Sequence, residues 1–89
     1  MKKLTQQVKV KNALGLHTRP ATAIVKLLQN CKCDVTFTYK RETINAKSIL
    51  SILMLAAKKN SNIQITVEGE EAEEVMHKIV SAFANKFGE

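Results

Sequence analysis

The segment Gly15-Leu16-His17-Thr18-Arg19-Pro20 brings together residue types that suit phosphoryl transfer. An imidazole nitrogen can act as a nucleophile, and a guanidinium binds phosphate oxygens through parallel N–H groups. Proline is tolerated in the first turn of a helix, so Pro20 predicts that a helix begins here. We therefore expect His17 at a helix N-terminus, with Arg19 close by.

A helix N-terminus offers free backbone N–H groups and a partial positive charge. This environment disfavours imidazolium, so we expect His17 to be neutral and nucleophilic. The same environment stabilises a phosphate once it is attached to the ring. Gly15 permits a close backbone approach before the helix. An isolated histidine is more often a simple cap, but the Gly-x-His-x-Arg-Pro combination favours the phosphoryl site. Neither a Ser/His/Asp triad nor a GxxxxGK[ST] loop occurs, so we expect no ATP binding.

The elements that position this segment follow from the spacing of the apolar residues. Strands are expected over residues 4–10 and 33–39, around 44–46, and over 63–67, and helices over about 20–30, 49–57 and 72–83. The order is β-α-β-β-α-β-α. This predicts one domain over residues 1–89, a two-layer α+β fold with the helices on one face of the sheet.

The second expected helix is unusually apolar. Ser48 has the character of an N-cap, and residues 49–57 are apolar at every position but Ser51. Such a helix is either buried all round or shows an apolar face to a partner. Met54 and Met76 are expected in the core, and His77 on the surface.

The charge of the chain is positive and unevenly distributed. The net charge is +6, and the basic excess lies in residues 1–67, whereas residues 68–89 are net acidic. This favours an acidic partner, either nucleic acid, an anionic protein face or a phosphorylated substrate, although simple solubility explains a basic surface equally well.

Other classes of protein are not supported by the sequence. Cys31 and Cys33 are too close for an unstrained disulfide and have no second pair for a zinc site, so we expect free thiols and no metal. No stretch is long and apolar enough to span a membrane, and the first residues do not resemble a secretion signal. We therefore expect a cytoplasmic location.

Two motifs at a characteristic separation resemble a known family. Ala13-Leu14-Gly15-Leu16-His17-Thr18-Arg19-Pro20-Ala21-Thr22 is similar to the active-centre signature of HPr, the histidine phosphocarrier of the bacterial phosphoenolpyruvate:sugar phosphotransferase system. Asn45-Ala46-Lys47-Ser48-Ile49-Leu50 resembles its second signature, around a regulatory serine. Glu68-Gly69-Glu70 also agrees, and the resemblance runs essentially end to end.

The resemblance implies a monomeric carrier without a cofactor rather than an independent catalyst. Enzyme I would phosphorylate His17 on Nδ1, and His17 would pass the group to an enzyme IIA domain. Arg19 and the N–H groups around Thr18 would stabilise the phosphate. The implied fold is an open-faced β-sandwich with four antiparallel strands in the order 1-4-2-3 and three helices on one side.

The resemblance also implies a docking face and a regulatory site. Partners would dock on Ile49, Leu50 and Leu53 together with three residues of the first helix, and we expect the remaining apolar residues Ile52 and Leu55 to be buried. The first-helix contacts are Thr18, Arg19 and Thr22. Ser48 would be the target of an ATP-dependent HPr kinase/phosphorylase, and a phosphate there would weaken docking to an acidic partner.

Three features depart from the family pattern. Leu14 stands where a polar residue is common, Ala56 stands where glycine is common in the second helix, and the net charge is higher than in the best-known members. The Leu14-Gly15 pair and the run Leu53-Met54-Leu55-Ala56-Ala57 resemble proteobacterial regulatory branches, including the nitrogen-related phosphocarrier. A regulatory carrier is therefore an alternative to sugar uptake. An RNA-recognition module shares the element order, but only Phe37 and Tyr39 are available for stacking on bases.

Overall fold

The computed structural model describes residues 2–89 and confirms the predicted element order; Met1 lies outside the described residues. The four strands are β1 (Lys2–Lys9), β2 (Asp34–Tyr39), β3 (Glu42–Asn45) and β4 (Asn62–Gly69). The helices are α1 (Thr18–Leu28), α2 (Ile49–Leu55), α3 (Ala72–Ala84) and a final 3₁₀ turn, η1 (Lys86–Gly88).

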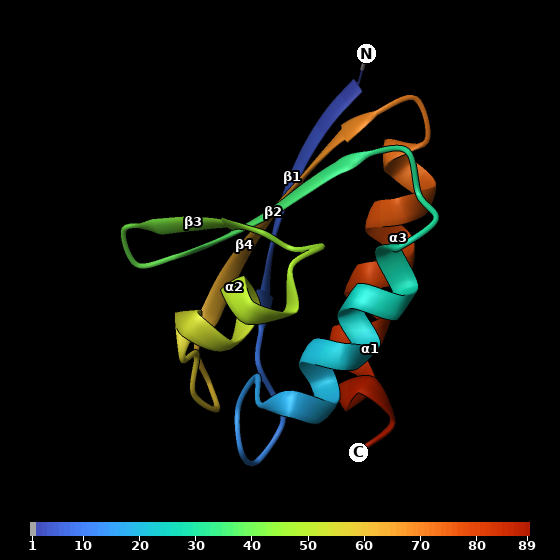
Figure 1. Ribbon diagram of the computed structural model, residues 1–89. Helices are drawn as coiled ribbons and strands as arrows, with labels where there is room; N and C mark the ends of the chain where they lie inside the picture. The colour runs from blue at the N-terminus through green and yellow to red at the C-terminus, as the bar shows by residue number, and fades with distance from the viewer. Residues whose placement is uncertain (1) are drawn as a thin grey trace.

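The strands form one antiparallel sheet in the order β1-β4-β2-β3, as the family resemblance implied. Helices α1 and α3 lie side by side, α2 lies near the β3 end, and the opposite face of the sheet carries no helix (Figure 1). In the two central strands, β2 and β4, residues that face the helices are buried and alternate with more exposed ones, whereas the edge strands β1 and β3 have at most half-buried residues.

Alternating apolar residues on the strands and the apolar stripes of the helices meet in one core. Phe37 of β2 packs edge-to-face against Phe83 of α3, with ring centroids 5.7 Å apart. The largest fully buried side chains also include Ile24, Ile52, Ile63, Ile65 and Ile79. Because Phe37 is buried under the helices, it is not available for stacking on RNA bases, which removes the main support for that alternative.

Helix α2 is shorter than its apolar sequence predicted. It ends at Leu55 rather than Ala57, because Ala56 adopts a left-handed conformation (φ 52°, ψ 38°) and its N–H donates to the carbonyl of Leu53. The N-cap at its other end is confirmed, since the Ser48 Oγ accepts a hydrogen bond from the Ser51 N–H at 3.2 Å. The placement of Met54 in the core was wrong, because this side chain is 71% exposed.

The expectations for the two cysteines, Met76 and His77 are confirmed. Cys31 and Cys33 are free thiols, with Cys33 buried against Gly69. Met76 is buried, and His77 is exposed on α3. No helix formed by residues 2–89 has both the length and the apolar character needed to cross a membrane.

Candidate functional site

His17 is the N-cap residue of α1, where the sequence placed it. Its backbone is extended, its carbonyl accepts the N–H of Ala21 at 3.0 Å, and its side chain makes no capping hydrogen bond. Helix geometry leaves the N–H groups of Thr18 and Arg19 without carbonyl partners inside α1. The imidazole therefore lies beside the positive end of a helix without bonding to it, at a place where an anion is favoured.

A tight backbone contact holds the loop in front of His17. The N–H of Leu16 donates to the carbonyl of Ala57 at 3.0 Å, and Gly15 has a left-handed φ of +68°. A Cβ on Gly15 would lie only 2.2 Å from the Ala57 carbonyl oxygen. Glycine is therefore required at position 15 by the left-handed φ and by the close approach to Ala57. The same contact joins the His17 loop to the segment that follows α2.

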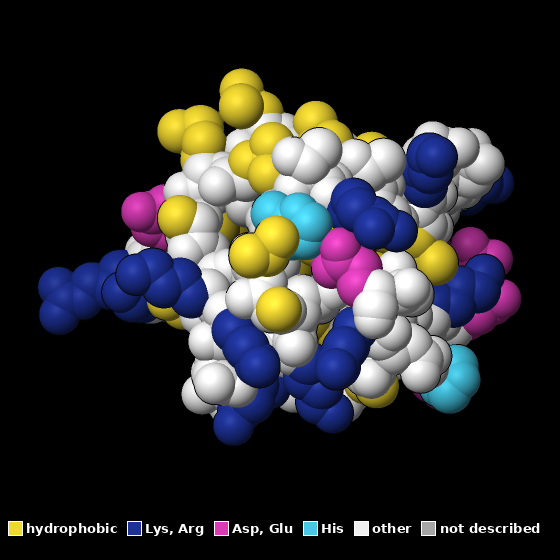
Figure 2. All heavy atoms as spheres, turned by 90° about the horizontal axis from the view of Figure 1, so that it is seen from below, with side chains coloured by type: hydrophobic (Ala, Val, Ile, Leu, Met, Phe, Trp, Pro, Cys, Tyr) yellow, Lys and Arg dark blue, Asp and Glu magenta, His cyan; other side chains and the backbone are white. Residues whose placement is uncertain are grey.

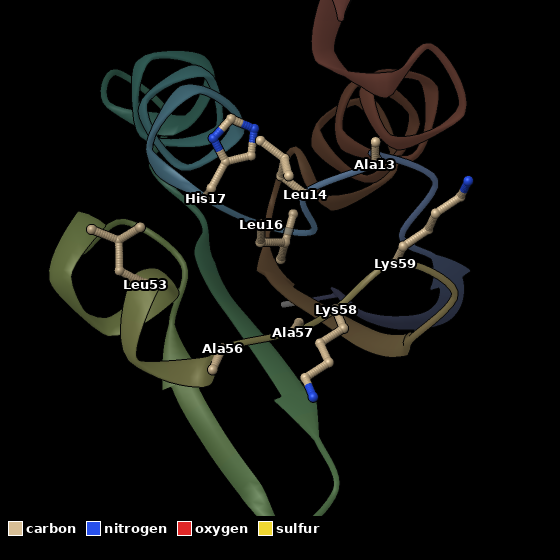
Figure 3. Close-up of a pocket in the computed structure, with 9 residues that line it drawn as sticks. All are labelled: Ala13, Leu14, Leu16, His17, Leu53, Ala56, Ala57, Lys58 and Lys59. Carbon is tan, nitrogen blue, oxygen red and sulfur yellow. The ribbon is translucent and has the colours of Figure 1, made fainter.

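An open cavity of about 490 Å³ lies beside the imidazole, between the loop and the end of α2. In Figure 3, Leu14 lies next to the His17 ring and Leu53 faces it from α2. Lys58 and Lys59 are also part of the cavity wall. The complete lining is Ala13, Leu14, Leu16, His17, Leu53, Ala56, Ala57, Lys58 and Lys59.

Several residues that were expected on the docking face are accessible to solvent. Ile49 and Leu50 are 39% and 64% exposed and Leu53 is half-buried, whereas Ile52 and Leu55 are buried as expected. Thr18 and Arg19 are exposed and Thr22 is half-buried on α1. Sequence reasoning missed Leu14 and Met54, which are 75% and 71% exposed. Figure 2 shows hydrophobic side chains gathered on one side of a histidine and lysines or arginines on another.

An acidic residue also contacts the imidazole, which the sequence analysis did not foresee. The Glu89 Oε2 lies 3.0 Å from the His17 Nε2 and 3.8 Å from the Arg19 Nε. The positive helix end and Arg19 are therefore accompanied by an anion, because the chain after α3 turns back and places a carboxylate at the site. The hydrogen bond donated by Asn12, with smaller contributions from His17 and Arg19, lowers the pKa of Glu89 below 4.5.

An open β-sheet layered with helices, with a partly exposed histidine at a helix N-terminus, is the architecture of a small carrier domain rather than of an enclosed catalytic pocket. The comparisons agree with this class. The family model described as the PTS HPr component phosphorylation site matches residues 4–85.

Similar proteins cover most of the chain. It is 52% identical over 80 residues to the phosphocarrier protein HPr of Chlamydia pneumoniae, which is 90% of this chain and 74% of that protein. It is 31% identical to HPr of Xylella fastidiosa over 97% of both chains. The crystal structure of HPr-C-His from Thermoanaerobacter tengcongensis superposes with a TM-score of 0.89 at 31% identity, covering 100% of this chain and 98% of that one. The chain belongs to the HPr family, the phosphocarrier proteins of the phosphotransferase system.

Proposed function

We propose that this HPr-family protein carries a phosphoryl group on the Nδ1 atom of His17, taking it from phosphorylated enzyme I and giving it to an enzyme IIA domain. The observation that carries the proposal is the position of the imidazole. It caps α1 without a side-chain capping bond, is 29% exposed, and borders an open cavity. A partner's phosphohistidine can reach such a ring, whereas a buried ring could neither accept a phosphoryl group from a partner nor pass it on.

The transfer needs no group beyond the two histidines and the charges around them. The lone pair of Nδ1 attacks phosphorus, and the donor's P–N bond breaks with its electron pair returning to the donor nitrogen. The N–H groups of Thr18 and Arg19 and the Arg19 guanidinium supply positive charge near the new phosphate. Arg19 is well placed for this because its side chain is 78% exposed and therefore free to move.

We further propose that partners dock beside His17 on the α1 residues Thr18, Arg19 and Thr22 and on an adjoining apolar surface, here called the docking face. The docking face comprises the expected residues Ile49, Leu50 and Leu53 and the exposed Leu14 and Met54. A small exposed apolar surface next to a reactive group suits a weak, rapidly exchanging interface. Lys58 and Lys59 border the same cavity and fit a partner with an acidic rim.

Ser48 is proposed as a regulatory phosphorylation site for HPr kinase/phosphorylase. It is half-buried at the N-cap of α2, directly before Ile49 and Leu50 of the docking face. A phosphate at a helix N-terminus is electrostatically tolerated, so the fold should persist. About two added negative charges beside the docking face would repel an acidic partner. A Ser48→Asp variant should therefore accept phosphate from enzyme I more slowly than the wild type, and an equal rate would contradict this role.

Incubation with phosphoenolpyruvate and enzyme I tests the proposed function. Mass measurement should show one added phosphoryl group that is labile in acid and stable in alkali, and addition of an enzyme IIA domain should remove it. His17→Ala should take up none, whereas His77→Ala, which changes an exposed histidine on α3, should behave as the wild type. Full uptake by His17→Ala would overturn the proposal.

A further inference from the structure

The Glu89 carboxylate is held against His17 by a buried amide. Asn12 is 1% exposed, and its Nδ2 donates both to the Glu89 Oε1 and to the Lys86 carbonyl oxygen at 2.8 Å. Both of these partners are acceptors, so the amide nitrogen rather than its oxygen must face them. The second carboxylate oxygen of Glu89 is then free to meet the His17 Nε2 at 3.0 Å.

A strained turn in the backbone of η1 places the Glu89 carboxylate beside His17. Lys86 and Phe87 have φ angles of 55° and 53°, a left-handed conformation that costs about 1–2 kcal/mol for each residue with a Cβ. Phe87 is fixed in this turn by edge-to-face packing on Phe83, with ring centroids 4.8 Å apart. The turn carries the chain from the end of α3 back to the mouth of α1, where Glu89 meets His17. Strain retained at such a place is typical of a functional constraint.

We infer that Glu89, held by Asn12, is a positioning residue that fixes the proton of His17 on Nε2 and leaves the Nδ1 lone pair free for phosphoryl transfer. This inference deepens the proposed function and rests on it. A carboxylate accepts hydrogen bonds only, so the contact requires the Nε2–H form of the ring. The hydrogen bond made by one ring nitrogen of histidine sets the protonation of the other.

The same carboxylate stabilises the charge that develops on the ring. When Nδ1 forms its bond to phosphorus while Nε2 keeps its proton, the imidazole acquires a positive charge. Glu89 lies on the Nε2 side and compensates that charge, and no proton has to move. The charged groups close to the ring are Glu89 and Arg19, and Lys58 and Lys59 belong to the wall of the same cavity with their side chains directed away from His17 (Figure 3). Glu89 is the single anion among them, so no other side chain in this set replaces it.

The contact between Glu89 and Arg19 also has a place in this scheme. At 3.8 Å, the Arg19 Nε is near the Glu89 Oε2, while its side chain remains largely exposed. The carboxylate therefore attracts the guanidinium toward the ring before transfer without fixing it there. Because this contact involves Nε, the terminal guanidinium nitrogens of Arg19 remain available for the phosphate, and Glu89 keeps its hydrogen bond to His17.

Spectra of the free protein and transfer rates together test the inference. In protein with ¹⁵N-labelled histidine, nitrogen chemical shifts should show the His17 proton on Nε2 alone, whereas Glu89→Gln should show a mixture of both tautomers. Glu89→Gln should also accept phosphate from enzyme I about tenfold more slowly, as expected for loss of a charge-assisted hydrogen bond. Asn12→Ala should shift both readouts in the same direction, because the carboxylate loses its support.

Controls separate this role from stability and from the carrier function itself. Glu70→Gln, which removes a carboxylate from the turn between β4 and α3, should leave both readouts and the unfolding midpoint unchanged. A wild-type ring protonated on Nδ1, or an unchanged tautomer and transfer rate in Glu89→Gln, would overturn the inference while leaving phosphate uptake intact. No phosphate uptake by the wild type would instead contradict the proposed function. The nitrogen chemical shifts of the free protein would still show which ring nitrogen of His17 carries the proton.

Discussion

Gly15 lies so close to Ala57 that a side chain on Gly15 would begin 2.2 Å from the Ala57 carbonyl oxygen. Through this contact, the loop before α1 and the segment after α2 form one unit, and the unit carries both His17 and part of the docking face. We therefore expect Gly15→Ala to lower the free energy of unfolding by more than the roughly 1–2 kcal/mol cost of a left-handed alanine. Denaturant unfolding measures this loss, and phosphate uptake should slow as His17 shifts.

Gly88 provides the matched control for Gly15. It also has a positive φ, +81°, but a Cβ there would have no atom within 4 Å. Gly88→Ala should therefore show only the conformational cost. Equal destabilisation by the two substitutions would mean that the close approach to Ala57 has no energetic consequence.

Ala56 is a second position where backbone conformation sets stability. Its left-handed φ of 52° ends α2 and is unfavourable for alanine. Ala56→Gly should raise the free energy of unfolding by about 0.5–1 kcal/mol, because relief of this strain outweighs the greater flexibility of glycine in the unfolded chain. Ala57→Gly, at a buried residue without a positive φ, should lower it instead. A destabilised Ala56→Gly variant would argue against the strain.

Glu89 gives the site a measurable pH dependence. Its pKa lies below 4.5, because the Asn12 amide donates to the carboxylate and because His17 and Arg19 also favour the ionised form. A carboxyl pKa that is lower in the folded state stabilises the fold above the unfolded value, and this contribution is lost as the pH falls through the folded pKa. A ¹³C titration of the Glu89 carboxyl should therefore have its midpoint below that of an exposed glutamate such as Glu70, and Asn12→Ala should raise it. Equal midpoints for the two carboxyls in the wild type would contradict the Asn12 contact.

Lys58 and Lys59 should speed the encounter with enzyme I through their position rather than through total charge. The double substitution Lys58→Glu/Lys59→Glu should slow phosphate uptake more than tenfold at low salt, with the difference shrinking as salt is added. Lys3→Glu/Lys32→Glu changes the net charge equally at the far end of the molecule. If both double variants slow uptake equally, the location of the two lysines beside the cavity has no special role.

The parts of this fold that depend on local patterns were predictable from the sequence. The helix start at His17 and the N-cap at Ser48 follow from residue types and spacing, whereas the strand order and the buried positions of α2 followed from the family resemblance. The contact of Glu89 with His17 was not predictable, because it joins residues 72 positions apart through a left-handed turn of two non-glycine residues. Periodicity carries no signal for such a turn. Met54 was misplaced because an entirely apolar helix does not show which of its faces is covered.

The central claim is that a single imidazole nitrogen carries the phosphoryl group. The protein with ¹⁵N-labelled histidine can be phosphorylated with phosphoenolpyruvate and enzyme I and examined by NMR for coupling between nitrogen and phosphorus. The predicted result is one-bond coupling to ³¹P at the Nδ1 of His17, with the proton retained near Nε2 and no coupling at His77. Coupling at Nε2 or at His77, or phosphate attached to a hydroxyl with neither histidine coupled, would contradict the account.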